Sequence, residues 1–112
     1  MEPISLDEAR GLLRGGRWLV LTGAGMSVDS GIPPFRGPGG LWERMDPELY
    51  CHVRTVESAP ERAWELFRLL DASILAAAPH AGHRAIATAE AAGRLVGVAT
   101  QNVDGLHQAA GS

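Results

Sequence analysis

Two short apolar runs, far apart in the chain, have the pattern of buried strands. The first covers residues 18–21 and is followed by Thr22, and the second, LVGVAT, covers residues 95–100. Both runs are nearly all apolar and rich in branched side chains, as buried parallel strands are. We therefore predict a strand at each position.

A helix is expected directly before the first strand. Ser5 and Glu8 have the spacing of a capping box at a helix N-terminus. Gly15 and Gly16 end the periodic segment just before the strand begins. The apolar positions that fall on one helical stripe are Leu6, Ala9, Leu12 and Leu13.

A longer helix is expected at residues 60–77. Ser58 and Glu61 repeat the capping-box spacing, and Pro60 suits the first turn of a helix. Its apolar residues recur at helical intervals, so we predict that this stripe is mostly core and lies against an apolar surface. The stripe consists of Trp64, Phe67, Leu70 and Ile74.

Pro79 ends that helix, and a further helix is expected at residues 81–92, closed by Gly93 in the usual cap position. Residues 43–57 are polar without a clean period, which predicts a variable surface connection. Residues 101–112 predict a polar turn and then a short helical segment containing Leu106, Ala109 and Ala110. A small-residue face suited to packing on a sheet is formed by Ala85, Ile86, Ala89 and Ala92.

Length and composition predict one small globular domain. The chain has 112 residues, of which 46% are hydrophobic and 21% charged, and its formal charge is −3. This balance gives no reason to expect nucleic acid as a partner.

Cys51 is the only cysteine, which excludes an internal disulfide and a multi-cysteine zinc site within the chain. Residues 1–5 lack a secretory pattern and no run suits a membrane span, so we expect a cytoplasmic protein.

The segment that follows the first strand, residues 23–42, carries the candidate chemistry. It reads GAGMSVDSGIPPFRGPGGLW. Glycines after a strand allow a ligand to approach the backbone closely, and amides of a following helical turn point at an anion. We therefore expect a nucleotide. Gly23 and Gly25 alone would suit an ordinary turn better than a ligand site. The third glycine of the dehydrogenase fingerprint is replaced by Val28.

The complete segment closely resembles the NAD-binding signature of the sirtuins, the NAD-dependent protein lysine deacylases. Gly-Ala-Gly, a serine, Ser-Gly-Ile-Pro, Phe-Arg and Gly-Leu-Trp occur in the family's order. Residues 79–85, PHAGHRA, resemble a sirtuin helix start, with His80 in place of the commoner asparagine. Residues 100–107, TQNVDGLH, match a third sirtuin segment.

The resemblance implies an α/β fold with a partial Rossmann-like, doubly wound parallel sheet that binds NAD. Two strands are too few for a complete sheet of this kind. We therefore interpret residues 1–112 as the N-terminal portion of such a domain, truncated, with the zinc-binding small domain absent. Zinc is expected only in a full-length relative.

In sirtuins an acyl group moves from a lysine of a protein or peptide to ADP-ribose, and nicotinamide is released. The general-base histidine of the family is expected beyond Ser112, so the chain alone is expected to be inactive and to contain no catalytic residue. The resemblance implies that Gly23, Ala24 and Gly25 hold the pyrophosphate. The other cofactor-binding residues that it implies are Ser27, Pro34, Phe35, Arg36, Trp42, Gln101, Asn102, Val103 and Asp104.

Two positions bear on the acyl group. Sirtuins that prefer acidic acyl groups carry a tyrosine and an arginine in the helix before the Pro79 segment, and the matching positions here are Phe67 and Leu70. Neither side chain offers a hydroxyl or a cation to a carboxylate. If these residues line the acyl pocket, a neutral group such as acetyl is expected.

Simpler interpretations stay open for most of these residues. Asp104 would also suit a helix cap, and the spacing of His80 and His83 suits a helix start better than a metal site. The whole chain could be a non-catalytic NAD-binding module, or an NAD glycohydrolase or ADP-ribosyltransferase, and the sequence gives no oligomeric state. The remaining alternatives are a core position for Phe35, a surface position for Arg36 and His52, turn formation by Gln101 and Asn102, and a passive thiol for Cys51.

Overall fold

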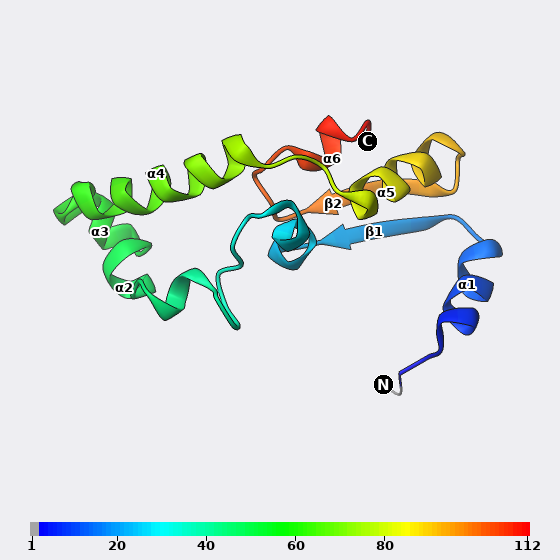
Figure 1. The fold of residues 1–112 in the computed structure, drawn as a ribbon, viewed down its shortest axis with the longest axis horizontal. Helices are drawn as coiled ribbons and strands as arrows, with labels where there is room; N and C mark the ends of the chain where they lie inside the picture. The colour runs from blue at the N-terminus through cyan, green and yellow to red at the C-terminus, as the bar shows by residue number, and fades with distance from the viewer. Residues whose placement is uncertain (1–2) are drawn as a thin grey trace.

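Two parallel strands lie at the centre of the fold (Figure 1). The structure, a computed structural model, describes residues 3–112. Met1 and Glu2, which belong to the predicted domain and to the N-terminal segment that lacks a secretory pattern, lie outside the described residues. Strand β1 (Trp18–Thr22) pairs with β2 (Leu95–Thr100), and Thr22 is the partner of Thr100. Both predicted strands are confirmed. Because the strands are parallel, their C-terminal ends lie at the same edge of the sheet.

The helices cover one side of this pair and extend well beyond it. Helix α5 contacts β2, whereas Leu19 and Leu21 of β1 remain exposed. In Figure 1, α4 runs away from the strands with α2 and α3 beneath its far end. The fold is thus α/β with a small parallel sheet, as predicted. Within residues 3–112, no helix is long and apolar enough to cross a membrane. The remaining elements are α1 (Leu6–Arg14), η1 (Ala24–Ser30), η2 (Leu41–Glu43), α2 (Pro47–Tyr50), α3 (Val53–Ser58), α4 (Pro60–Ala76), α5 (Ala81–Ala91) and α6 (Leu106–Ala109).

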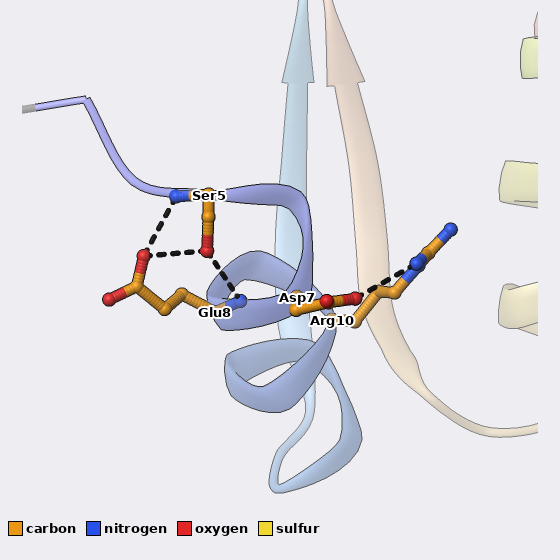
Figure 2. Close-up of polar contacts among 4 residues, drawn as sticks. All are labelled: Ser5, Asp7, Glu8 and Arg10. Carbon is orange, nitrogen blue, oxygen red and sulfur yellow. Dashed lines mark hydrogen bonds and ion pairs between the residues drawn. The ribbon is translucent and has the colours of Figure 1, made fainter.

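Helix α1 begins with the predicted capping box (Figure 2). The Glu8 amide donates to Ser5 Oγ at 3.2 Å, while the Ser5 amide and hydroxyl both donate to Glu8 Oε2, at 2.8 and 2.7 Å. These bonds, the backbone bond first, lower the pKa of Glu8. One turn on, Arg10 pairs with Asp7 at 3.0 Å. The capping box fixes where the helix starts, but its apolar stripe is not buried: Leu6, Leu12 and Leu13 are all exposed.

Residues 43–57, predicted as a variable surface connection, are mostly exposed, but they contain two helices, α2 and α3, that were not predicted. Asp46 caps α2 by accepting from the Glu48 amide at 2.9 Å. His52, predicted as a surface residue, is half-buried and caps α3 by accepting from the Arg54 amide at 3.1 Å. Both helices are too short to show an apolar period, so only their side-chain caps marked them in the sequence.

Helix α4 starts at Pro60 as predicted, but without the predicted capping box. Its N-cap residue is Ala59, which has no side-chain hydrogen bond. The Ser58 hydroxyl donates instead to the Arg54 carbonyl at 2.7 Å, inside α3. The presence of α3 directly before α4 therefore explains why Ser58 does not act as the cap.

The buried stripe of α4 also differs from the prediction. Ala63 and Leu66 are buried, and Leu66 packs with Leu41 and Met45 in the main core cluster. Trp64 and Phe67 are 58% and 47% exposed, so the prediction that they are core residues is wrong. Contacts with α2 and α3 determine which side of α4 is covered. Because those two helices were not predicted, the covered side could not be identified either.

Helix α5 has nearly the predicted bounds, and Gly93 follows it with φ +70°, as a closing glycine should. The buried residues of α5 are His83 and Ala87. Ala85 and Ala92, predicted to face the sheet, are exposed. The small-residue face is therefore displaced around the helix, because α5 contacts both β2 and α6. The short helix α6 confirms the predicted C-terminal helical segment.

Candidate functional site

The C-terminal ends of β1 and β2 deliver two turns to the same edge of the sheet. Their last residues are joined by a hydrogen bond of 2.8 Å from the Thr22 hydroxyl to Thr100 Oγ1. The Gln101 amide then donates to the Thr22 carbonyl at 3.2 Å. The chain leaving β1 enters η1, and the chain leaving β2 forms the turn before α6. In open α/β sheets, ligands bind outside this end of the strands.

Side chains connect these two turns into one unit. Asn102 Nδ2 donates to the Gly23 carbonyl at 2.9 Å and to Ser27 Oγ at 3.1 Å. The Ser27 hydroxyl, which is 1% exposed, donates to Asp104 Oδ2 at 2.5 Å. Asp104 Oδ1 accepts from the Leu106 amide at 2.9 Å. The N-cap residue of α6 is Gly105, however, so the prediction that Asp104 itself caps this helix is wrong. The two turns are therefore two walls of a single cleft.

A cavity of about 150 Å³ lies between these walls. Its surface is largely apolar, and its polar lining residues are Ser27, Gln101, Asn102 and Asp104. Among residues 3–112, Asp104 is the one charged residue that lines it. The complete lining consists of Ala24, Ser27, Ile32, Pro33, Phe35, Leu70, Ile74, Gln101, Asn102, Val103 and Asp104.

The segment after η1 folds back on itself and presents Phe35 to the cavity. The Phe35 ring stacks on Trp42, with centroids 5.3 Å apart, and the Trp42 amide donates to the Phe35 carbonyl at 3.0 Å. Phe35 is exposed rather than a core residue. Pro34, Arg36 and Trp42 lie in the same segment but do not line the cavity, and Arg36 is exposed.

Neither backbone conformation nor contacts within the protein require glycine at positions 23 and 25 of the first turn. Gly23 has φ −137°, an extended conformation open to other residues, and Gly25 has no positive φ either. A Cβ added at Gly23 or Gly25 would have no protein atom within 4 Å. Gly31, in contrast, ends η1 with φ +90°, where glycine is needed for the backbone. Close approach by a ligand would account for glycine at the first two positions.

Three histidines pack in a row behind the cleft. The His83 ring is fully buried, with its centroid 4.4 Å from that of His80 and 5.0 Å from that of His107. Burial first, and then the neighbouring His80 and His107, lower the pKa of His83. His107 Nε2 lies 2.9 Å from Thr22 Oγ1. No group of three or more candidate metal ligands is present within residues 3–112. The three rings therefore pack α5 and α6 against the end of β1.

Several residues that line the cavity were not assigned to a site from the sequence. Ile32 and Pro33 belong to the Ser-Gly-Ile-Pro string, so the motif that contained them was the available signal. Ile74 was predicted only as part of the apolar stripe of α4. Of the two residues predicted to contact the acyl group, Leu70 lines the cavity and Phe67 does not.

Comparison with protein families identifies the family of this chain. The sequence model described as the Sir2 family matches residues 23–112, which include every residue of the cavity lining. The chain belongs to the Sir2 family. The resemblance to sirtuins is therefore confirmed.

Curated Sir2 relatives are similar over most of this chain. NAD-dependent protein deacylase 2 of Pyrobaculum aerophilum is 51% identical over 94 residues, which are 84% of this chain and 38% of the relative. NAD-dependent protein deacetylase 1 of Streptomyces coelicolor is 49% identical over 100 residues, which are 89% of this chain and 33% of the relative. This sirtuin chain thus spans less than half of the length of either protein.

Solved Sir2 structures have the same backbone arrangement. A Sir2 protein with a deacetylated p53 peptide and 3′-O-acetyl ADP-ribose has a TM-score of 0.88 and 35% identity. The match covers 97% of the sirtuin chain described here and 44% of that protein. A Sir2 complex with a p53 peptide and NAD⁺ has a TM-score of 0.78 and 34% identity. The partial Rossmann-like fold is therefore confirmed.

Proposed function

We propose that residues 1–112 form the N-terminal portion of the NAD-binding domain of a sirtuin-type, NAD-dependent protein lysine deacylase. The main support is the position of Asn102, whose side-chain amide bonds to both the Gly23 carbonyl and the Ser27 hydroxyl. This contact joins the ends of both strands into one cleft of the kind in which α/β proteins bind dinucleotides. The names of the relatives, which are deacylases and deacetylases, agree with this function.

The residues of the cleft fit NAD in three respects. Gly23 and Gly25 leave the backbone of the first turn open to the pyrophosphate. The apolar part of the cavity, which includes Phe35, suits a flat aromatic ring. Asp104 offers acceptor oxygens to a carboxamide, which has two N–H donors. We therefore assign NAD as the cofactor of this cleft.

The proposed roles follow the two walls of the cleft. Gly23, Ala24 and Gly25 hold the pyrophosphate. Phe35 and Arg36 lie near the ribose and nicotinamide, and Gln101 and Asn102 bind on the ribose side. Asp104, with the backbone near Val103, accepts from the carboxamide. Ser27, Pro34 and Trp42 complete the set of cofactor-binding residues.

The proposed reaction transfers an acyl group from lysine to ADP-ribose. Bound NAD would supply the bond between nicotinamide and ribose, which breaks as the acyl-lysine oxygen attacks the anomeric carbon. The apolar residues of the cavity, among them Ile32 and Phe35, exclude water from this centre. Ser27 and Asn102 hold Asp104 and the first turn in fixed positions before the cofactor arrives.

We propose a neutral acyl group, such as acetyl, as the substrate group. Leu70 and Ile74 extend the apolar lining from α4, and Asp104 would repel a second carboxylate. Phe67 is exposed on the same helix and offers no cation or hydroxyl. An acyl-lysine protein or peptide is the proposed partner. A cytoplasmic location stays a prediction.

A non-catalytic NAD-binding module is the second candidate, and one observation favours it. The four histidines of the chain are His52, His80, His83 and His107, and none of them lines the cavity. A general base must lie within hydrogen-bond reach of the proton that it removes. The residues of this chain would then bind the cofactor without completing the reaction.

Calorimetry and mass spectrometry on the same sample test these proposals. Titration of NAD into the chain is expected to give saturable one-to-one binding, and no binding would contradict the proposed cofactor site. NAD and an acetyl-lysine peptide are then added together. Acylated ADP-ribose supports the deacylase, whereas binding without nicotinamide release supports the non-catalytic module. Free ADP-ribose as the only product would instead indicate NAD hydrolysis or ADP-ribosyl transfer.

A further inference from the structure

Within residues 3–112, helices α3 and α5 each begin with a histidine cap, but only the cap of α5 also contacts η1. At α3, His52 Nδ1 accepts from the Arg54 amide at 3.1 Å. At α5, His80 Nδ1 accepts from the Gly82 amide at 2.9 Å. The His80 ring continues beyond the cap, because its Nε2 lies 2.6 Å from the Met26 carbonyl oxygen in η1. His80 therefore connects α5 to the segment that forms one wall of the cleft.

The partners of His80 determine where its proton lies. A backbone amide can only donate, so Nδ1 must carry a lone pair. A carbonyl can only accept, so Nε2 must carry the hydrogen. His80 is thus held as a single tautomer, with both ring nitrogens bonded to backbone groups. Neither end of the ring can move without loss of a hydrogen bond.

We call the hydrogen bond from His80 Nε2 to the Met26 carbonyl the bridge. The residues around the bridge leave space for the imidazole ring. A Cβ added at Gly82 would lie 2.6 Å from His80 Cε1 and 3.1 Å from Met26 Cε. Glycine at this position therefore lets the ring lie between α5 and η1. The next residue after Met26 is Ser27, whose hydroxyl bonds to Asp104 and Asn102. A carbonyl fixed at Met26 consequently fixes the backbone that presents Ser27 to the cleft.

We propose that His80 is a positioning residue for the cofactor cleft. Its Nε2–H holds the Met26 carbonyl, and through it the Ser27 hydroxyl, in the geometry that receives NAD. This inference rests on the proposed function, but His80 does not line the cavity and acts only through η1. Asparagine can replace Nδ1 as the cap acceptor but is too short to reach Met26. Glutamine can place a donor near the position of Nε2 but provides no acceptor at the cap.

Three variants separate the cap from the bridge. His80→Asn keeps the cap and removes the bridge, His80→Gln does the reverse, and His52→Asn makes the same cap change far from the cleft. We expect His80→Asn to weaken NAD binding by about 3- to 10-fold, the effect of one hydrogen bond, and to lower Tm more than His52→Asn, which keeps its cap and has no such bond to lose. We expect His80→Gln to lower Tm but to bind NAD within about twofold of the original chain. Unchanged NAD affinity in His80→Asn would overturn the proposal.

Hydrogen exchange tests the same inference without NAD. Amides of residues 24–30 are expected to exchange about 3- to 10-fold faster in His80→Asn than in the original chain or in His52→Asn. Equal exchange in all three would overturn the positioning role even if NAD binds. If NAD does not bind the original chain but exchange rises as expected, the proposed cofactor fails and the bridge between α5 and η1 stands.

The contact between His80 and Gly82 provides a second test. Gly82→Ala is expected to lower Tm by at least about 4–8 °C in the original chain, because the new Cβ overlaps the imidazole. In the His80→Asn background the loss should be much smaller, since the ring is absent. Additive effects of the two substitutions would show that the ring does not lie over Gly82, and would overturn the proposal.

Discussion

The Ser27 hydroxyl donates a hydrogen bond of 2.5 Å to Asp104 Oδ2, between the segment after β1 and the turn after β2. Ser27 Oγ also accepts a hydrogen bond from Asn102 Nδ2 at 3.1 Å. We expect Ser27→Ala to reduce the free energy of unfolding by about 1–3 kcal/mol, because two half-buried partners, Asp104 and Asn102, each lose a hydrogen bond. NAD affinity should fall in parallel. Urea unfolding and calorimetry measure the two effects.

Ser30 provides a matched control within the same short helix. Its buried hydroxyl oxygen has no hydrogen-bond partner among residues 3–112. Ser30→Ala therefore removes a polar group that gains nothing from its position, and stability should change little or increase. Equal losses in Ser27→Ala and Ser30→Ala would contradict the network described for the cleft.

Gly25→Ala is expected to separate ligand binding from folding. A Cβ at this position has no protein neighbour within 4 Å and requires no change of backbone conformation. Stability should therefore stay the same or rise slightly, since alanine restricts the unfolded chain. NAD binding should weaken by at least about 10-fold if the pyrophosphate lies against this backbone. Thermal unfolding and NAD titration give the two values.

Gly11→Ala is the control for that experiment. Gly11 lies in the exposed helix α1, where a Cβ also has open space. Helix propensity predicts a gain of about 0.5–1 kcal/mol and no change in NAD affinity. If Gly25→Ala binds NAD as well as Gly11→Ala does, the first glycine turn does not contact the cofactor.

Asn102→Asp should open the cleft from the other side. The new carboxylate cannot donate a hydrogen bond to the Gly23 carbonyl. It also lies near the carboxylate of Asp104, and the two negative charges repel each other. We expect a loss of about 1–3 kcal/mol in the free energy of unfolding and weaker NAD binding. Gln108→Glu makes the same amide-to-carboxylate change at an exposed position of α6. Chemical denaturation of both variants at pH 7 is the measurement. Similar losses of unfolding free energy would contradict the role of the hydrogen bond from Asn102 to the Gly23 carbonyl.

The buried His83 predicts a dependence of stability on pH. Burial lowers the pKa of His83 in the folded chain below the ordinary 6.5. Below pH 6.5 the unfolded chain therefore binds a proton that the folded chain does not, so stability is complete above this pH and falls as the pH is lowered. The slope approaches about 1.4 kcal/mol per pH unit for this one proton.

Urea unfolding between pH 5 and 8 measures this slope in two variants. His83→Asn keeps an acceptor for the His80 amide but does not titrate, so its profile should be flatter even if the variant is less stable. His52→Asn should keep the original slope, because His52 lies outside the histidine row. A slope that is unchanged in His83→Asn would assign the pH dependence to another group.

The sequence predicted the parts of the fold that have a clear local signal. Both strands, the Ser5 cap and the start of α4 at Pro60 follow from apolar runs, capping spacing and proline. The sequence did not predict α2 and α3, because these helices are too short to show an apolar period. Since α2 and α3 cover one side of α4, that buried side could not be predicted either. Trp64 was assigned to the core because helical spacing identifies a stripe but not what covers it.

The candidate cleft was predicted in outline, and its internal contacts were not. Motif strings indicated that Gly23 and Asn102 belong to one site, and the structure brings them within 2.9 Å. Nothing in the sequence indicated the bond from His80 to the Met26 carbonyl. Such contacts depend on the placement of α5 relative to η1, which local patterns do not encode. Family strings therefore identify the residues of a cleft more readily than their partners.

The pairing of Trp18–Thr22 with Leu95–Thr100 has a consequence for folding kinetics. Roughly 70 residues must be looped out before the first hydrogen bond between these strands can form, and such closure costs entropy before any contact repays it. Helices such as α4 can form early from local contacts, whereas both walls of the cleft depend on this late event. A refolding experiment should therefore recover helical circular dichroism before it recovers the capacity to bind a nucleotide.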